Sequence, residues 1–274
     1  MNTVPLTPYE TWYRDGGLST YAEVFSHNDE KTVEVEIIVN RLKKSLHWPS
    51  DKTLAILDIG CGTGRFTVML LDQLCTSVGL GCTSNVDLVD INSGAFDRFR
   101  TTTTNAQSAK ISVRQTITAP WRLINVNNLH PPYHLIVADH VFYGEPLTTT
   151  LLDRLTGLTI PEGIIVVTLQ TADSDVFRMR DLAGIVNNGA EDFAALLEHC
   201  GAKFETLDYE SRLYFELTDH IFKDWFFATT KVKTDEQQRL LRAYTLRDEI
   251  GRTYLSNRAN IFLIWGVQKD DIGG

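Results

Sequence analysis

Near residue 60 the chain reads Leu54-Ala55-Ile56-Leu57-Asp58-Ile59-Gly60-Cys61-Gly62-Thr63-Gly64-Arg65, an apolar run that ends in three alternating glycines. A short and nearly continuous apolar run is typical of a strand that is buried on both faces of a sheet. The glycines permit a tight turn and the close approach of a ligand to bare backbone. A helical pattern then runs over 66–74. A strand, a glycine turn and a helix in this order predict a loop of the nucleotide-binding type.

The same alternation continues beyond this loop. Apolar runs predict further strands at 86–91, 111–116, 134–138 and 164–169, and helical patterns fall at 94–100 and 151–158. The segment 75–84 is expected to form an extended loop. Strands that alternate with helices favour a parallel sheet covered on both faces.

The two ends of the chain have a different character. A helix capped by Ser26 or Asn28 is predicted by an apolar stripe at helical spacing, Val35, Ile38, Val39, Leu42 and Leu46. Near the other end we expect a helix at 192–199 and strands at 204–215 and 261–267. Helical segments at 221–227 and 235–250 lie between these strands, and Thr234 with Gln237 matches a capping box.

Together these patterns predict an α/β fold. We expect a central, mostly parallel seven-stranded sheet flanked by helices, with an N-terminal helical lid and a helical insertion between the last two strands. Residues 1–274 should form a single domain. Within it, 1–48 would be the lid region, 49–170 the ligand-binding core, and 171–274 the substrate-side elements and final strands.

Composition narrows the class of protein. The 274 residues are 43% hydrophobic and carry 26 basic and 35 acidic side chains, a net charge of −9. Such a chain can build a core, and its negative charge disfavours nucleic acid as a partner. Without an apolar run of membrane-spanning length or a secretory start, a soluble cytoplasmic protein away from membranes is expected. The four cysteines lack metal-ligand spacing, which predicts buried free thiols and no metal site.

The spacing of the glycines selects among ligands. A dinucleotide fingerprint needs its third glycine at position 65, where Arg65 stands. The pattern Asp58-x-Gly60-x-Gly62-x-Gly64 instead resembles motif I of the Rossmann-like S-adenosylmethionine-dependent methyltransferases. The resemblance implies S-adenosyl-L-methionine as cofactor, S-adenosyl-L-homocysteine as product, and Asp58 as a partner of the cofactor's ammonium group. The cofactor-binding residues that it implies are Asp58, Gly60, Cys61, Gly62, Thr63, Gly64, Asp90, Ile91, Thr118, Asp139 and His140.

Two strand ends carry the remaining polar candidates. Asp90 closes the second strand, where an acid in this family accepts both ribose hydroxyls; Asp87 competes for that role but lies mid-strand. The fourth strand leads into Asp139, His140 and Tyr143, which should face the methyl-transfer centre because ligands bind beyond the carboxyl ends of strands. The loop His130-Pro131-Pro132-Tyr133 precedes this strand and is interpreted as a rigid loop, not as an amino-methyltransferase motif.

The whole layout resembles the histamine N-methyltransferase-like branch of the family. The resemblance implies that Glu30 binds the substrate amine and that His140, where the branch has glutamine, also contacts substrate. An asparagine of the branch falls on Arg258 or, with a one-residue slip, on Asn257. Trp225 lies in the segment that resembles the substrate-covering insertion. The departures argue against histamine itself, and Arg258 would suit an acceptor with a carboxylate.

The leading hypothesis is therefore methyl transfer to a small amine or amino-acid-like acceptor by in-line displacement. Glu30 would orient the amine, His140 would take its proton, and Tyr143 would complete the catalytic group. One alternative keeps the fold and moves the methyl group to a carboxylate or hydroxyl oxygen. A second is a regulatory or partner protein that binds the cofactor without catalysis.

Overall fold

The computed structural model describes residues 5–26, 28–79, 82–107, 109–182, 188–215, 227 and 234–266. Its sheet has eight strands: β1 (Thr53–Ile59), β2 (Cys82–Asp90), β3 (Ala109–Thr118), β4 (Tyr133–Asp139), β5 (Thr159–Gln170), β6 (Phe204–Tyr214), β7 (Leu246–Arg247) and β8 (Thr253–Trp265). Their order is β3-β2-β1-β4-β5-β8-β6, with β7 also paired to β8. The strands β1 to β5 pair in parallel, whereas β8 is antiparallel to β5, β6 and β7.

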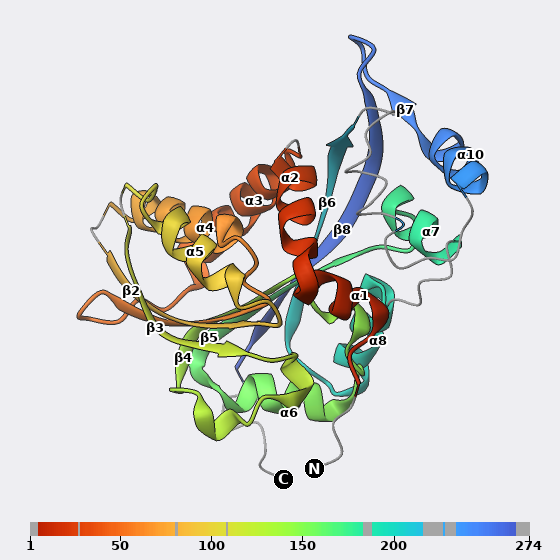
Figure 1. Cartoon of the computed structure of the whole chain (residues 1–274). Coiled ribbons are helices and arrows are strands. Elements are labelled where there is room, and N and C mark those ends of the chain that lie inside the picture. The colour runs from red at the N-terminus through yellow and green to blue at the C-terminus, as the bar shows by residue number, and fades with distance from the viewer. Residues whose placement is uncertain are drawn as a thin grey trace.

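The helices cover both faces of this sheet (Figure 1). They are α1 (Pro8–Trp12), the π-helical turn η1 (Tyr13–Gly17), α2 (Leu18–Ser26), α3 (Glu30–Ser45), α4 (Arg65–Ser77), α5 (Gly94–Thr103), α6 (Thr149–Gly157), α7 (Asp175–Leu182), α8 (Ala190–His199) and α10 (Thr234–Tyr244). Short 3-10 turns follow β3 and β4: η2 (Trp121–Leu123), η3 (Val126–Asn128) and η4 (Phe142–Gly144). Within the part of the chain that the structure describes, no helix is long and apolar enough to cross a membrane.

Strand β1 shows why its sequence is apolar throughout. Leu54 and Ile56 belong to the core beneath α3, α4 and α5, whereas Leu57 and Ile59 belong to the core on the α6 and α8 side. Successive side chains of a strand point to opposite faces, so both faces of β1 are covered. The continuous apolar run is thus a direct consequence of its central place in the sheet.

The predicted helix after residue 30 is confirmed as α3. Its apolar stripe from Val35 to Leu46 is buried. The predicted cap at Ser26 is wrong, because that residue ends α2. Asn28 supports the helix start instead, since its Oδ1 accepts a hydrogen bond from the Glu30 amide at 2.8 Å.

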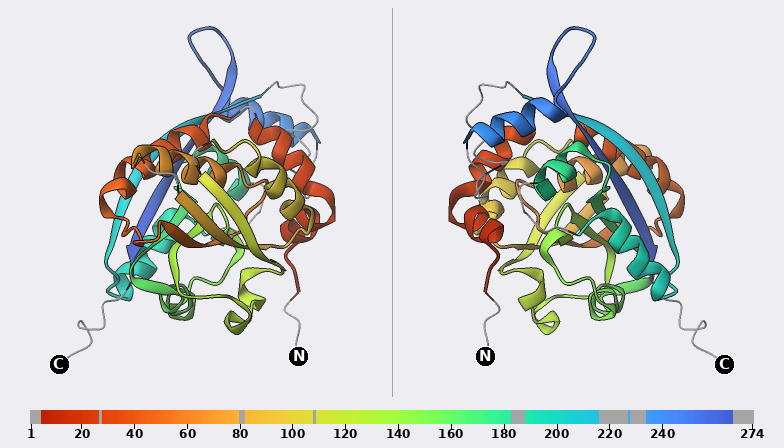
Figure 2. Two further views of the ribbon diagram at one scale, coloured as in Figure 1. Left: turned by 90° about the vertical axis from the view of Figure 1, so that its left-hand side faces the viewer. Right: turned by 90° about the vertical axis from the view of Figure 1, so that its right-hand side faces the viewer.

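The sheet and the segment after α10 differ from prediction. The sheet has eight strands and mixed orientation, not seven mostly parallel ones. The helix expected over 235–250 ends at Tyr244, and a hairpin of β7 and β8 follows and projects beyond the rest of the sheet (Figure 2). The turn between these strands is local: the Asp248 carboxylate accepts hydrogen bonds from the amides of Ile250 and Arg252, and Gly251 has a φ of 83°.

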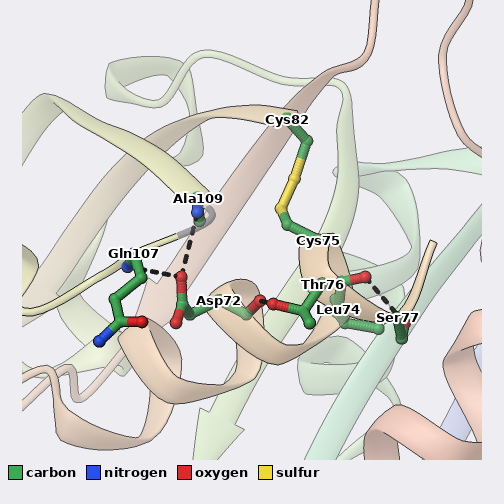
Figure 3. The surroundings of a disulfide bond; sticks show 8 residues. All are labelled: Asp72, Leu74, Cys75, Thr76, Ser77, Cys82, Gln107 and Ala109. Carbon is green, nitrogen blue, oxygen red and sulfur yellow. Dashed lines mark hydrogen bonds between the residues drawn. A yellow bond between two sulfur atoms is a disulfide. The ribbon is translucent and has the colours of Figure 1, made fainter. Parts of the chain in front are cut away.

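The predicted loop at 75–84 is wrong, and the prediction of free thiols holds for two of the four cysteines. Helix α4 continues to Ser77 and β2 begins at Cys82, so Cys75 and Cys82 face each other with 5.8 Å between their Cα atoms and form a disulfide (Figure 3). Asp72 on the same helix accepts hydrogen bonds from the amides of Gln107 and Ala109 at the start of β3. Cys61 and Cys200 are free.

Candidate functional site

A pocket opens at the carboxyl ends of β1, β2 and β4. This is the edge at which open α/β sheets bind ligands. Eight of the residues predicted to bind the cofactor line it: Gly60, Cys61, Gly62, Thr63, Asp90, Ile91, Asp139 and His140. Three others, Asp58, Gly64 and Thr118, do not; in place of Thr118 the wall is made by Ala119, Pro120 and Trp121.

The glycines of the loop between β1 and α4 differ in function. All three have positive φ, 71° at Gly60, 51° at Gly62 and 75° at Gly64. A Cβ atom on Gly60 would lie 2.3 Å from Val141 Cγ2, and one on Gly64 would lie 2.5 Å from a Phe99 ring carbon. Above Gly62 the nearest atom would be the Tyr13 hydroxyl at 3.6 Å. Gly60 and Gly64 therefore allow close packing, whereas Gly62 leaves its backbone bare beside open space in the pocket.

Asp90 is the acid that faces the pocket from β2. Its Oδ2 accepts a hydrogen bond from the Gly62 amide at 2.9 Å, and its Oδ1 accepts one from the Asn92 amide at 2.8 Å. Burial raises the pKa of Asp90 to about 6, against the opposing effect of these backbone donors. The Ile91 amide also acts as a backbone donor to Asp90. Since a carboxylate offers about four lone-pair sites, Asp90 can still accept a hydrogen bond from a ligand.

Asp87, the competing acid on the same strand, is committed to a different partner. Arg114 donates to both of its oxygens at 2.8 and 2.7 Å, and the Tyr133 hydroxyl donates to Oδ2 at 2.6 Å. The His130 amide in turn donates to the Tyr133 hydroxyl at 3.1 Å. His130 and Tyr133 of the loop 130–133 thus pack around Asp87.

Asp58 lies beneath the glycine loop instead of in the pocket wall. It is buried, and burial raises its pKa to about 7, although a hydrogen bond from Thr67 lowers it. Its Oδ2 has no hydrogen-bond partner among the described residues. A buried carboxylate oxygen without a hydrogen-bond partner is energetically costly. This oxygen is therefore suited to a bound cation, or to a water molecule that a bound cation holds. Together with the bare backbone at Gly62, this oxygen fits the cofactor implied by motif I.

Glu30 is held behind the pocket and does not line it. Its Oε1 accepts hydrogen bonds from His140 Nε2 at 2.8 Å, Asn257 Nδ2 at 2.6 Å and the Tyr209 hydroxyl at 3.3 Å. Its Oε2 accepts one from Asn28 Nδ2 at 3.2 Å. The side chain is fully buried. The prediction that Glu30 meets the substrate amine directly therefore needs correction, because protein donors already occupy both oxygens.

The charges of Glu30 and His140 stabilise each other. Burial raises the pKa of Glu30, but the nearby Lys31 and His140 outweigh it and bring the pKa to about 2. Burial lowers the pKa of His140, but the Glu30 carboxylate outweighs it, and the pKa lies above its ordinary value. The two side chains form a buried ion pair.

His140 lines the pocket, yet both of its ring nitrogens are engaged. It stands just after β4 with a φ of 55°. Nε2 contacts Glu30, and Nδ1 lies 2.5 Å from the hydroxyl of Tyr143, which also accepts a hydrogen bond from the Gln170 amide at 3.1 Å. Tyr143 is half-buried and does not line the pocket, and desolvation raises its pKa well above the ordinary value. Neither ring nitrogen is presented to an acceptor, contrary to the role of general base expected for His140.

Asn257 and Arg258, the two alternatives at the last strand, lie on opposite faces of β8. Asn257 is buried in the Glu30 network and accepts a hydrogen bond from Gln170 at 2.8 Å. Arg258 is exposed and pairs with Asp173 at 2.7 Å and Glu210 at 3.3 Å. The alignment that places the family's asparagine on Asn257 is therefore the one that puts this side chain inside the protein. Arg258 is paired with acids at the surface and is not available to an acceptor. Trp225 lies outside the described residues.

Sequence reasoning missed Lys31, which does line the pocket. Its ammonium lies 2.6 Å from Asp139 Oδ2 and 3.1 Å from Glu34 Oε2. Among the described residues, ligand atoms of Glu34, Asp139 and His140 lie within 4.8 Å of one another, close enough for a metal, but the Lys31 ammonium already supplies the cation between the two carboxylates. Lys31 and Glu34 fall on the apolar stripe of α3, and charged residues on such a stripe were the available signal.

The N-terminal helices contribute to the pocket wall, with Glu10 of α1, Tyr13 of η1, and Tyr21 and Ala22 of α2. Glu10 of α1 pairs with Arg122 Nη1 and Nη2 at 2.5 and 2.8 Å, and Arg122 also lies 3.2 Å from Glu145. Asn92 Nδ2 donates to the Tyr13 carbonyl at 2.8 Å. These contacts connect the N-terminal segment to the loops after β2, β3 and β4.

Comparisons with known proteins show which proteins share this fold. No family model and no curated protein matches the chain. Among solved structures, similarity extends to a candidate methyltransferase of Bacillus halodurans, with a TM-score of 0.54 at 11% identity over 84% of this chain and 99% of that one. The fold is that of the Rossmann-like methyltransferases.

Two further structures with this fold cover nearly the whole chain. The plantazolicin methyltransferase BpumL, solved with S-adenosylhomocysteine, has a TM-score of 0.54 at 14% identity over 95% of this chain and 94% of its own. The CurJ carbon methyltransferase has a TM-score of 0.54 at 15% identity over 96% of this chain and 62% of its own. At such identities the similarity establishes the fold and leaves the reaction to the site.

Proposed function

We propose that this protein is an S-adenosyl-L-methionine-dependent methyltransferase that acts on a small molecule, with an amine nitrogen as the favoured acceptor. The observation that carries the proposal is that Gly62 and Asp90 line the pocket side by side, joined by a hydrogen bond. Bare backbone lies at the end of β1, and a carboxylate with unused lone pairs lies at the end of β2, 2.9 Å from the Gly62 amide. This combination suits a ligand with vicinal hydroxyls and an extended chain.

The residues of the chain act mainly by positioning. Gly60 to Thr63 would support the amino-acid portion of the cofactor, Asp90 would accept the ribose hydroxyls, and the free oxygen of Asp58 would balance the ammonium group through water. When bound, the cofactor supplies a methyl group on a positively charged sulfur. Holding donor and acceptor in line can contribute about 7–11 kcal/mol to catalysis.

Several features of the pocket favour an amine acceptor. Its wall includes the acids Asp90, Asp139, Glu10 and Glu145. The acids outnumber the basic side chains of the same wall, Lys31, Arg65 and His140, and an excess of acids favours cationic molecules. Arg258, which would have favoured an acceptor with a carboxylate, is exposed and paired elsewhere. Asp139 is the acid at the β4 end, where the acceptor would lie, and its Oδ1 has no hydrogen-bond partner among the described residues.

We also propose that Glu30, Asn257 and Tyr143 act through His140 as positioning residues. They fix the ring from both sides, so that His140 forms a stable wall beside the acceptor. Transfer to oxygen and cofactor binding without catalysis remain the alternatives that an experiment must separate.

Calorimetric titration with S-adenosyl-L-homocysteine, followed by a methyl-transfer screen over amines, amino acids, alcohols and carboxylic acids, tests the proposal. We expect micromolar binding and turnover on amines. Asp90→Ala should weaken binding by about 100-fold, because two hydrogen bonds to a charged group are lost. Asp87→Asn is the matched control, a buried acid on the same strand, and should leave the affinity of folded protein unchanged. Binding without turnover on any acceptor would favour the non-catalytic alternative, and no binding would refute the proposal.

A further inference from the structure

Lys31 is a buried amine that contacts the pocket and that the proposed function leaves without a role. It is 6% exposed, and its ammonium is fixed between Asp139 and Glu34. Lys31 and Arg65 are the two lysine or arginine residues that line the pocket within the described chain. Burying a lysine is costly unless its charge has partners, so the buried position of the Lys31 ammonium requires an explanation.

Taking the proposed function as its basis, we infer that Lys31 binds the carboxylate of the cofactor's amino-acid portion. The order of the strands gives the direction along the pocket. Asp90 ends β2, the glycine loop follows β1, and Asp139 ends β4, in the spatial order β2-β1-β4. Lys31 contacts Asp139, so it lies across the glycine loop from Asp90. A ligand whose ribose is held by Asp90 and whose chain follows the loop extends toward Lys31.

The surroundings of Lys31 also suit an anion. Its ammonium lies 5.4 Å from the ring centre of Phe66, in the first turn of α4. The amides at the N-terminus of a helix favour negative charge, and α4 has 13 residues. The same wall of the pocket therefore offers a lysine and the start of a helix.

Counting donors and charges shows that Lys31 can accept another partner. An ammonium has three donors, and two carboxylate oxygens lie within hydrogen-bond distance, at 2.6 and 3.1 Å, whereas Glu30 is 3.9 Å away. Glu30 is already paired with His140. Burial and the neighbouring Asp139 raise the pKa of Glu34 to about 8, so that near neutral pH this side chain is mainly uncharged. The ionised carboxylates near Lys31 are then Asp139, in hydrogen-bond distance, and Glu30, which is 3.9 Å away and shares its charge with His140, and one N–H of Lys31 remains for a further carboxylate.

A carboxylate on Lys31 could belong to the cofactor or to an amino-acid-like acceptor. Titration without any acceptor separates the two sources. The probes are S-adenosyl-L-homocysteine and 5′-deoxy-5′-(3-aminopropylthio)adenosine, which differ only by the carboxylate. The wild-type protein is expected to bind the first more tightly, and the ratio of the two dissociation constants measures recognition of the carboxylate.

The variants are Lys31→Met, Lys31→Arg and two matched controls. Lys43→Met lies on the same helix, where the Lys43 ammonium donates to Asn40, and Arg65→Met removes the other cation of the pocket. Lys31→Met should weaken S-adenosyl-L-homocysteine by about tenfold or more, the effect of one lost charge-assisted hydrogen bond, and leave the carboxylate-free analogue within about twofold. Lys31→Arg should keep most of the wild-type ratio, and both controls should keep all of it.

Equal losses for both ligands in Lys31→Met would assign Lys31 a structural role and overturn the inference. So would a wild-type ratio near one, or a ratio lost in Arg65→Met. The last two outcomes are decisive even if Lys31→Met does not fold. Failure of the proposed function gives a different result, in which the wild-type protein binds neither ligand.

Discussion

The three glycines of the loop show how residues with the same backbone conformation serve different purposes. Each has positive φ, which costs a residue with a Cβ about 1–2 kcal/mol. At Gly60 the Cβ would also overlap Val141, whereas at Gly62 it would enter the pocket. Stability and ligand binding should therefore separate between these two positions.

We predict that Gly60→Ala loses stability and that Gly62→Ala loses ligand affinity. In Gly60→Ala, overpacking adds about 1–3 kcal/mol to the backbone strain. In Gly62→Ala, the strain is about 1–2 kcal/mol, but the methyl group occupies space where the cofactor backbone approaches, so affinity for S-adenosyl-L-homocysteine should fall by about tenfold or more. Urea denaturation and calorimetry measure the two effects.

Gly79→Ala is the control for this pair. Gly79 has a φ of 66° and no atom within 4 Å of a Cβ, and it does not line the pocket. It should show the strain without any change in affinity. Unchanged affinity in Gly62→Ala would mean that the ligand does not approach this backbone.

The choice between Asn257 and Arg258 marks a limit of sequence reasoning at this scale. Both positions lie on the same strand, and adjacent residues point to opposite faces. The face that points inward is set by pairing with β6, where Asn257 lies opposite Ser211 and Arg258 opposite Glu210. Register between strands that are distant in sequence is not encoded in either residue alone.

At the scale of elements, an ion pair with Arg122 holds helix α1 at the pocket. Arg122 pairs with Glu10 of α1 and with Glu145 after η4, and all three side chains are largely buried. A partly buried bidentate pair is stronger than a surface pair. Arg122 is thus the best candidate for the contact that keeps α1 over the pocket.

We predict that Arg122→Ala loosens this covering segment. Hydrogen exchange at residues 5–26 should become faster, and S-adenosyl-L-homocysteine should bind about tenfold more weakly, because the segment must be ordered again on binding. Asp15→Ala removes an exposed pair with Arg14 on the same segment and should change neither quantity. Exchange that stays the same in both variants would show that other contacts hold the segment.

Elements were predictable where local periodicity defines them. The strands β1 to β5 and the helices between them follow from alternating apolar runs, since each is buried on a face that its own sequence shows. The predictions failed where contact between two segments decides the structure, even when the segments are only a few residues apart. The disulfide depends on the end of α4 lying beside the start of β2, and the hairpin after Tyr244 depends on pairing with β8. The candidate site followed the same rule: the loop and Asp90 could be found, but the burial of Glu30 and Lys31 required the assembled fold.

At the scale of the whole molecule, acidic side chains occur in the interior as well as on the surface. The chain has a net charge of −9, and Asp58, Asp90 and Glu34 are buried on β1, β2 and α3. Burial raises the pKa of Asp90 to about 6, of Asp58 to about 7 and, with Asp139, of Glu34 to about 8. These groups bind protons more tightly in the folded chain than in the unfolded chain, so they stabilise the fold when protonated.

Stability should therefore fall as the pH rises from about 5 to 8. An acid with a raised folded pKa contributes stability that is present at low pH and is lost as the pH passes through the folded value. His140 acts in the same direction, because its pKa is also raised. Glu30 has a pKa of about 2 and contributes a constant amount above its ordinary value of 4.5.

Urea denaturation at several pH values should show a loss of more than about 1.4 kcal/mol across this interval, the equivalent of one pKa unit for one group. Asp58→Asn removes one of the titrating carboxyl groups, so its profile should be flatter than that of the wild-type protein. The amide keeps an oxygen to accept the hydrogen bond from Thr67. Stability that rises from pH 5 to 8, or parallel profiles in the two proteins, would show that these carboxyl groups are ionised in the folded chain. The pocket would then hold a permanent negative charge, not one that develops as the pH rises.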